Sequence, residues 1–209
     1  MRLVIFGATG RTGIPLIQQA LAAGHEVVAF ARTPSKIPVQ HERLTSIQGE
    51  IQDAAKVAEA IKGADAVLNV LGPNKTSGKA MLATAAQNIV AAMQQHRVQR
   101  LVSLTGAGIR DEKDEPKVMD RVMGVLLRLL SAEVLKDSEN AVATFRNSGL
   151  DWTIVRGPML TEGPQLGKYR VGYVGKDSGI RISRADVAAF MLKLATESSY
   201  LKQMPMVSD

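Results

Sequence analysis

The stretch LVIFGATGRTGIPLIQQAL, residues 3–21, decides the fold of this chain. It opens on four apolar residues that predict a buried strand and closes on apolar residues at helical spacing, with three glycines between them. Where a helix follows a strand directly, its unpaired N–H groups and its dipole attract a phosphate, provided that no Cβ intrudes. We therefore predict a dinucleotide site in which Gly7 permits the tight turn, Gly10 admits the pyrophosphate, and Gly13 lets the helix pack closely on the strand.

The rest of the chain alternates strands with helices. Apolar runs predict parallel strands at Arg2–Phe6, Glu26–Ala31, Leu44–Gln48, Ala66–Leu71, Arg100–Leu104 and Trp152–Val155. Helical patterns lie between them at Thr12–Ala23, Gln52–Lys62, Lys79–His96 and Ser131–Asn147. This order predicts an α/β fold, a doubly wound parallel sheet in a single domain over residues 1–209, with a small C-terminal portion on the substrate side.

Composition narrows the class of protein. The chain has 209 residues, 45% of them hydrophobic, which is enough for the core of one domain. The absence of cysteine excludes disulfides, thiolate catalysis and cysteine-ligated metal and fits a reducing compartment, so we expect a cytoplasmic protein. The three histidines lie far apart in the sequence, and no metal is expected. We find neither a signal-peptide pattern nor an apolar run as long as a membrane helix, and we expect no membrane partner.

The net charge of +6 raises the question of a nucleic-acid partner. The basic residues are scattered along the chain, and aromatic residues make up only 4% of it, fewer than stacking platforms for RNA need. We therefore expect no nucleic-acid partner and interpret the charge as a basic surface that attracts anionic small molecules.

The end of the second predicted strand, VVAFARTPSK at residues 27–36, indicates the choice of cofactor. An acidic residue at this place would accept hydrogen bonds from the ribose 2′-hydroxyl of NAD. Arg32 stands there instead, with Ser35 close behind it and Arg11 in the glycine segment. Because guanidinium groups and hydroxyls suit a 2′-phosphate, we predict NADP(H) as the cofactor. The alternative is that Arg32 is an ordinary solvated arginine.

The remaining cofactor candidates lie where strands end, because in doubly wound sheets the carboxyl edge faces the ligand. Glu50 and Ile51 are expected to flank the adenine, and Leu71 and Gly72 to pass near the ribose and the pyrophosphate. Each of these four, taken alone, could also be a plain residue at the end of a strand. The candidates in the glycine segment are Gly7, Thr9, Gly10, Arg11, Thr12 and Gly13.

The chemistry is expected after the fifth strand, in LVSLTGAGIR at residues 101–110. Reduction of a ketone needs a proton donor, typically a tyrosine whose pKa is lowered by a lysine four residues later. None of Tyr169, Tyr173 and Tyr200 has such a lysine. A flavin or a conjugated tetrapyrrole spreads the added charge over its rings and can take its proton from water, so such a site can work by proximity alone.

Five segments together resemble one known family. They are IFGATGRTG at 5–13, ARTPSK at 31–36, AAQNIVAAMQQHRVQRLV at 85–102, RNSGLDWTIVRGP at 146–158 and RISRADVAAFML at 181–192. The sequence is similar to the flavin reductase/biliverdin-IXβ reductase family of NAD(P)H-binding atypical short-chain dehydrogenase/reductases, which have a Rossmann fold. The resemblance spans nearly the whole chain, and the glycine motif is its least specific part.

The resemblance implies an NADPH-dependent reductase with a permissive pocket over the nicotinamide and a small-molecule acceptor: a flavin, biliverdin or a quinone-like compound. Thr105 and Gly106 would contact the nicotinamide side of the cofactor, and Arg156, Pro158 and Met159 would form the loop beside it. The family often has Thr-Ser where this chain has Thr105–Gly106. Strand periodicity places Ser103 deeper on the side of Thr105, and these two are the candidate catalytic residues.

The role of one helical stripe and the choice between an enzyme and a regulator stay open. The apolar helical stripe of Pro116–Leu130 is either a helix packed on the core or a lid over the acceptor, with Met119 and Met123 touching flat rings. The alternative to an enzyme is a redox-sensing regulator of the NmrA type that binds NADP(H) without turnover. Epimerase or dehydratase activity on nucleotide sugars is disfavoured because that chemistry needs the missing tyrosine. We expect a monomer or a weak homo-oligomer.

Overall fold

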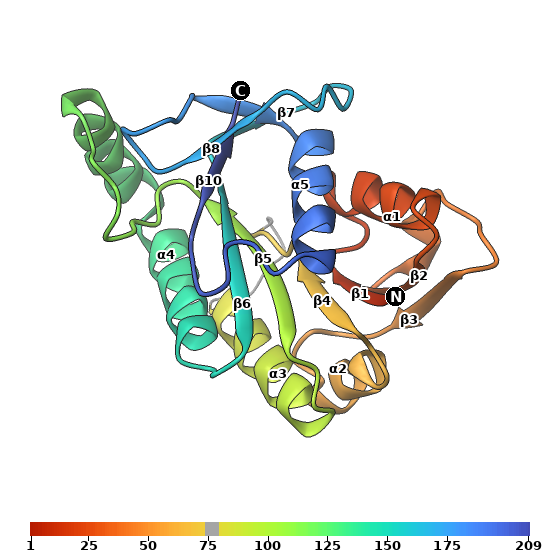
Figure 1. Ribbon diagram of the computed structural model, residues 1–209. Helices are drawn as coiled ribbons and strands as arrows, with labels where there is room; N and C mark the ends of the chain where they lie inside the picture. The colour runs from red at the N-terminus through yellow and green to blue at the C-terminus, as the bar shows by residue number, and fades with distance from the viewer. Residues whose placement is uncertain (74–79) are drawn as a thin grey trace.

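An eight-stranded sheet forms the centre of the computed structural model, which describes residues 1–73 and 80–209 (Figure 1). Its strands lie in the order β3-β2-β1-β4-β5-β6-β10-β8. They are β1 (Arg2–Phe6), β2 (Glu26–Ala31), β3 (Leu44–Gln48), β4 (Ala66–Asn69), β5 (Arg100–Gly106), β6 (Asp151–Gly157), β8 (Arg170–Gly172) and β10 (Met206–Ser208). The first six positions have the doubly wound order, so the predicted α/β fold is confirmed.

The C-terminal part of the chain adds strands that the sequence patterns did not predict. β10 extends the sheet beside β6 in parallel, and β8 pairs with β10 antiparallel. β7 (Met159–Thr161) and β9 (Arg181–Ser183) form a separate two-stranded parallel sheet. Each of these four strands has only three residues, too few for a periodic pattern to be recognised.

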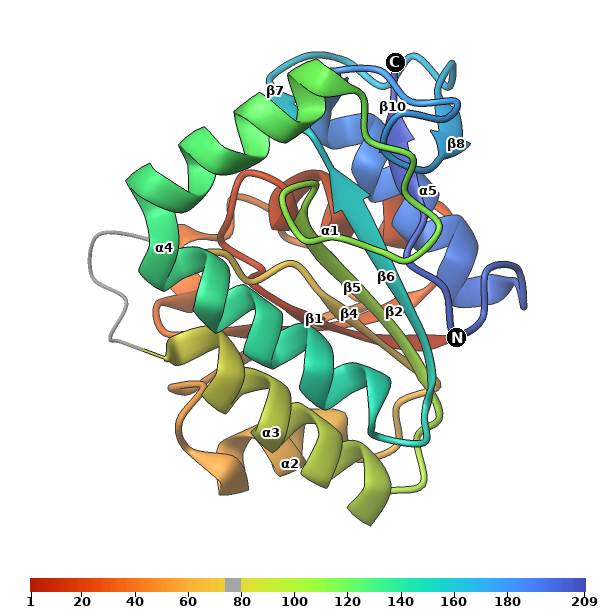
Figure 2. The same cartoon turned by 90° about the vertical axis from the view of Figure 1, so that its left-hand side faces the viewer.

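Helices cover both faces of the sheet. They are α1 (Gly13–Ala22), α2 (Ala54–Ile61), α3 (Met81–Gln95), α4 (Val118–Arg146) and α5 (Arg184–Thr196), with a short 3₁₀ turn at Pro34–Lys36. Figure 2 shows α2, α3 and α4 on the near face and α1 and α5 behind the sheet. None of these helices, within the described part of the chain, is long and apolar enough to cross a bilayer.

The predicted helices agree with the structure within a few residues, with two qualifications. The helix expected to start at Lys79 begins at Met81, and Lys79 itself lies outside the described residues. The patterns at 116–130 and 131–147 belong to one element, α4, with a kink at Ser131, where φ is −143° and ψ is 34°. The interruption between the two patterns therefore marks the kink at which two helical segments meet.

Two hydrophobic clusters form, one on each face, because successive side chains of a strand point to opposite sides. In β1, Leu3 and Ile5 pack with residues of α1 and α5, whereas Val4 and Phe6 pack with residues of α2, α3 and α4. All four side chains are fully buried. This double burial explains why β1 is an uninterrupted apolar run. The parallel pairing of β1 to β6 brings their carboxyl ends to one edge of the sheet.

Candidate active site

Two adjoining pockets open at the carboxyl edge of the sheet. The first has a volume of about 210 Å³ and is lined by Gly7, Thr9, Gly10, Phe30, Ala31, Arg32, Gly49, Glu50, Ile51, Gln52, Val70, Leu71, Gly72 and Met81. The second, of about 510 Å³, is lined by Thr9, Gly10, Arg11, Thr12, Asn69, Val70, Leu71, Gly72, Pro73, Leu82, Ser103, Leu104, Thr105, Gly106, Ser138, Ala141, Val142, Phe145, Gly157, Pro158, Leu160 and Arg184. The loops after β1 and β4 line both, so one extended ligand can lie across the two pockets.

The glycine loop after β1 leaves no room for side chains. Gly7 has a φ of +83°, and a Cβ on it would lie 2.7 Å from the carbonyl oxygen of Val70. A Cβ on Gly13 would overlap the carbonyl oxygen of Gly7, so the start of α1 packs directly on the turn. The N-cap residue, Thr12, makes no side-chain hydrogen bond to the first turn of α1. The backbone N–H of Ile14 donates to the carbonyl oxygen of Gly10 at 3.0 Å and Pro15 has no N–H, so within the described part of the chain the N–H of Gly13 is the helical donor that fits a bound phosphate group.

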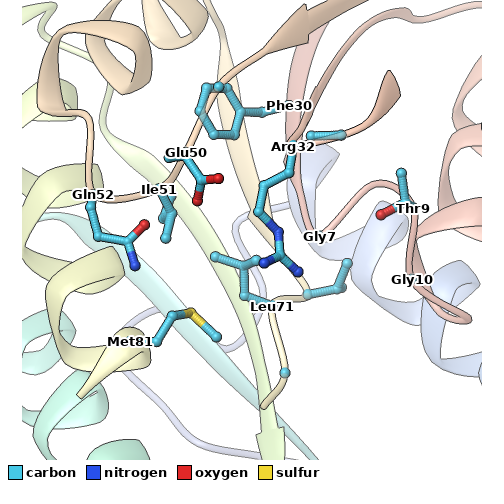
Figure 3. Close-up of a pocket in the computed structure, with 14 residues that line it drawn as sticks. Gly7, Thr9, Gly10, Phe30, Arg32, Glu50, Ile51, Gln52, Leu71 and Met81 are labelled. Carbon is cyan, nitrogen blue, oxygen red and sulfur yellow. The ribbon is translucent and has the colours of Figure 1, made fainter. Parts of the chain in front are cut away.

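The first pocket combines polar and apolar walls, as Figure 3 shows. Arg32 reaches across it from the end of β2, opposite Glu50 and Gln52. Within the described part of the chain, no carboxylate forms an ion pair with Arg32. Ile51 and Met81 are buried and give an apolar surface on which a flat ring can lie.

A pair of buried polar side chains lines the second pocket. The Asn69 side-chain amide donates a hydrogen bond to the Ser103 hydroxyl at 3.0 Å, and its oxygen accepts one from the backbone N–H of Leu71 at 3.2 Å. Since the Ser103 hydroxyl accepts from Asn69, its own proton stays available to a ligand. Thr105 lies two residues further along β5 and is partly exposed. The lining of the second pocket contains neither a tyrosine nor a lysine among the residues that the structure describes.

The second half of α4 forms one wall of the second pocket through Ser138, Ala141, Val142 and Phe145. Asp137, next to this wall, accepts hydrogen bonds from the backbone N–H groups of Leu82 and Ala83, both at 2.9 Å. The residue before α3 is an alanine that cannot cap the helix with its side chain, so Asp137 supplies the cap from another helix. This contact fixes α4 against α3 beside the pocket.

The first half of α4 does not pack on the core, so that interpretation of the apolar stripe is wrong. Seven of its apolar side chains are between 47% and 77% exposed: Val118, Met119, Val122, Val125, Leu126, Leu129 and Leu130. Met119 is not among the residues that line either pocket. The side chain of Met123 lies outside the described residues. The stripe is an exposed apolar surface above the site.

Most of the predicted site residues come together in the two pockets. They are Gly7, Thr9, Gly10, Arg11, Thr12, Arg32, Glu50, Ile51, Leu71, Gly72, Ser103, Thr105, Gly106 and Pro158. Ser35 and Met159 are exposed and belong to neither lining, and Gly13 lies under the loop.

The placement of the Arg156 side chain requires a correction. It is fully buried outside both pockets and forms a two-pronged ion pair with Asp114, with both N–O distances at 2.7 Å. It also donates to the carbonyl oxygens of Met204 and Ile109. A guanidinium group whose donors are occupied by these partners cannot reach a cofactor. The position of Arg156 at the end of a strand gave no sign of these buried partners. It ties the loop after β5 to β6 and the C-terminal segment.

Two opposing effects act on the pKa of Asp114. Burial alone would raise the pKa of this carboxyl group. Hydrogen bonds from Arg156 and from the backbone N–H groups of Asp111 and Val174, together with the charge of Arg156, outweigh burial and hold the pKa below its ordinary value. Asp114 is therefore an ionised partner for the buried arginine.

Sequence reasoning missed several residues of the site. Asn69 could have been found, because it is a polar residue at the end of an otherwise apolar strand. Phe145 and Ser138 lie on a helix whose pattern predicted only its packing, and Arg184 begins a helix about 175 residues after the glycine loop. Only the folded chain brings these three to the pocket.

Known proteins match nearly the whole chain. Residues 7–198 match the model of an NAD(P)H-binding family. The chain is 27% identical to the uncharacterized protein YwnB of Bacillus subtilis, over 89% of this chain and 84% of that protein. It is 32% identical to a 3-beta-hydroxysteroid dehydrogenase of Mycolicibacterium neoaurum, but that match covers 48% of this chain and only 31% of the relative.

Solved structures share the fold. The anaerobilin reductase ChuY of Escherichia coli O157:H7 superposes with a TM-score of 0.78 at 20% identity, over 100% of this chain and 97% of that chain. A short-chain dehydrogenase/reductase of Veillonella parvula, solved in complex with NADP, gives 0.78 at 21% identity, over 100% and 94%.

Proposed function

The chain belongs to the NAD(P)H-binding family, and two of its relatives are named as an oxidoreductase and a reductase. On that premise we propose that it is an NADPH-dependent reductase of an extended, conjugated acceptor such as a flavin or a biliverdin-like tetrapyrrole. The observation that carries this proposal is the continuity of the two pockets. Thr9, Gly10, Leu71 and Gly72 line both, so a dinucleotide that enters the first pocket can end in the second, larger one.

The glycine loop and the start of α1 would hold the pyrophosphate. Gly10 and Thr9 line both pockets, and Thr12 and Arg11 line the second. The space beside Gly10 is free of side chains, as close approach of a phosphate requires. Glu50 and Ile51 would lie against the adenine, with Leu71 and Gly72 along the ribose.

The preference for NADPH over NADH rests on Arg32. Its side chain enters the first pocket and has no carboxylate partner within the described part of the chain, so its donors are available to a 2′-phosphate. A lone surface arginine would not need to point into a cavity. The Veillonella parvula relative solved with NADP agrees with this choice.

The second pocket would accept the molecule to be reduced. When bound, the nicotinamide supplies a hydride. The chain's own contribution is position and an apolar wall: Ala141, Val142 and Phe145 can contact a flat ring, while Ser103 and Thr105 offer hydroxyl groups on the β5 side. Because the described part of this lining has no tyrosine–lysine pair, an acceptor that spreads charge over its rings suits it better than a simple ketone. The anaerobilin reductase with the same fold supports a tetrapyrrole-like acceptor.

The second candidate is a regulator that binds NADP(H) and a protein partner without turnover. The exposed apolar face of α4 favours it, because such a surface suits contact with a partner. Oxidation of NADPH, followed by its absorbance with FMN, riboflavin, biliverdin and a quinone in parallel, distinguishes the two candidates. Turnover with a conjugated acceptor supports the reductase. Tight NADPH binding with no turnover of any of the four would favour the regulator.

A further inference from the structure

The second pocket has an uneven charge. Among its described lining residues the charged side chains are Arg11 and Arg184, both basic, and none is acidic. Arg11 comes from the glycine loop and Arg184 from the first position of α5, and both guanidinium groups contact the same carboxylate oxygen of Glu162. The other side chains of the wall are apolar or uncharged, and Glu162, which pairs with both guanidinium groups, does not line the pocket.

The two arginines differ in burial. The Arg11 side chain is 75% exposed, whereas the Arg184 side chain is only 12% exposed and has therefore lost most of its hydration. Arg184 donates one hydrogen bond, to Glu162 at 2.7 Å. No other acceptor among residues 1–73 and 80–209 pairs with its guanidinium group, which can donate five hydrogen bonds. It is a nearly buried cation with spare donors at the pocket wall.

Nearby carboxylates do not neutralise this cation fully. Asp186 lies two residues later, but its oxygens accept hydrogen bonds from Ser183 and from the backbone N–H groups of Leu166 and Gly167. Glu162 is 65% exposed, and one of its oxygens serves both Arg184 and Arg11, the latter at 3.3 Å. An ion pair with so exposed a carboxylate is weak and can be exchanged for another anion.

We propose that Arg184 binds an acidic group of the acceptor, a phosphate or a carboxylate, in place of Glu162. This inference rests on the proposed reductase function and narrows its substrate class to conjugated acceptors that carry an anionic substituent. The guanidinium fork matches either anion with two parallel hydrogen bonds. The apolar side chains of Val142, Phe145 and Leu160 would hold the rings, and Arg184 would fix their orientation.

FMN and riboflavin test the proposal because they share the same ring and differ in one phosphate. In steady-state assays with NADPH we expect wild-type protein to have a lower KM for FMN than for riboflavin. Arg184→Gln should raise the KM for FMN about tenfold, the scale of one hydrogen bond to a charged group, and leave that for riboflavin within about twofold. Glu162→Gln should lower the KM for FMN, because it removes the competing carboxylate.

Arg181→Gln is the matched control. It makes the same change of charge three residues earlier, at an arginine that pairs with Asp209 at 2.8 Å and lines neither pocket, and it should leave both KM values unchanged. Equal loss with FMN and riboflavin in Arg184→Gln, or no preference for FMN in the wild type, would overturn the proposal. So would a rise in the Kd of NADPH at an unchanged FMN:riboflavin ratio, since Arg184 would then bind the cofactor's pyrophosphate.

Binding at equilibrium separates this inference from the proposed function. Quenching of flavin fluorescence in the presence of NADP⁺ gives the Kd of FMN and of riboflavin without turnover. A preference for FMN that Arg184→Gln abolishes supports the anion site even if no flavin is reduced, in which case only the reductase function fails. Absence of that preference in a protein that does reduce flavins would overturn the anion site alone.

Discussion

The two pockets are built in different ways. The lining of the first comes from residues 7–81, which follow the ends of β1, β2, β3 and β4 in turn and reach the start of α3. The lining of the second extends from Thr9 to Arg184. The first depends on backbone geometry at glycines that exclude a Cβ. The second depends on contacts between distant segments: Asn69 with Ser103, and Asp137 with the start of α3. The first pocket thus depends mainly on backbone geometry, and the second depends on contacts between distant segments.

The largest expected effect concerns the buried ion pair between Arg156 and Asp114. Asp114→Asn leaves Arg156 buried with its charge unbalanced, so we expect the free energy of unfolding to fall by about 3–5 kcal/mol. Urea denaturation measures it. Glu115→Gln is the control, because its pair with Lys176 at 3.4 Å is exposed and should contribute less than about 1 kcal/mol. Equal losses in the two variants would contradict a special role for the buried pair.

The same ion pair predicts how the free energy of unfolding changes at acid pH. The folded-state pKa of Asp114 lies below the ordinary value of 3.8, so its ionised form stabilises the fold at neutral pH, and this contribution is lost as the pH falls below about 4 through the folded-state pKa. The free energy of unfolding should therefore drop less steeply below about pH 4 in Asp114→Asn than in the wild type. Parallel pH profiles would refute the assignment.

The next effect concerns the phosphate cradle in the first half of the site. A side chain in Gly10→Val occupies the space where the pyrophosphate is proposed to lie, and we expect NADPH binding to weaken more than about 100-fold, which corresponds to about 2.8 kcal/mol. Titration calorimetry gives the Kd. Gly163→Val is the control, since a Cβ there would meet nothing nearer than 3.9 Å. Near-normal affinity in folded Gly10→Val would show that the loop is only a turn.

Arg32 tests whether the first pocket distinguishes the two nicotinamide cofactors. If its guanidinium group pairs with the 2′-phosphate, Arg32→Ala should weaken NADPH binding by about 1.5–3 kcal/mol and leave NADH binding almost unchanged. The ratio of the two Kd values is the measurement, because a loss of folding would weaken both. An unchanged ratio in a stably folded variant would transfer the role to Arg11.

The smallest effect is expected for Thr105, in the second pocket. Thr105→Val removes a hydroxyl at nearly constant shape. We expect kcat/KM for the acceptor to fall about fivefold, which corresponds to a loss of about 1 kcal/mol of transition-state stabilisation. Thr45→Val, the same change at an exposed site on β3 outside both pockets, should have no effect. A loss of more than about 100-fold would mean that Thr105 contributes more than one hydrogen bond.

The sequence by itself determined the fold and most of the lining of the first pocket. Strands buried on both faces appear in the sequence as apolar runs. The turn into α1 needs glycines at fixed positions. Both features can be recognised because they involve residues close together in the sequence. The lining of the first pocket follows because parallel strands bring their carboxyl ends to one edge. Ser35 did not follow this rule, since the 3₁₀ turn after β2 leaves its side chain exposed.

Only the tertiary structure decided the second pocket and its surroundings. Arg156 lies beside a glycine and a proline that suggest a ligand loop, yet its partner Asp114 is 42 residues away and draws the side chain into the core. The apolar stripe of α4 has the pattern of a packed helix, but the kink at Ser131 turns it away from the sheet, so its side chains are exposed. Arg184 reaches the pocket because α5 packs beside α1. Such long-range contacts leave no local pattern, because each depends on where distant segments pack.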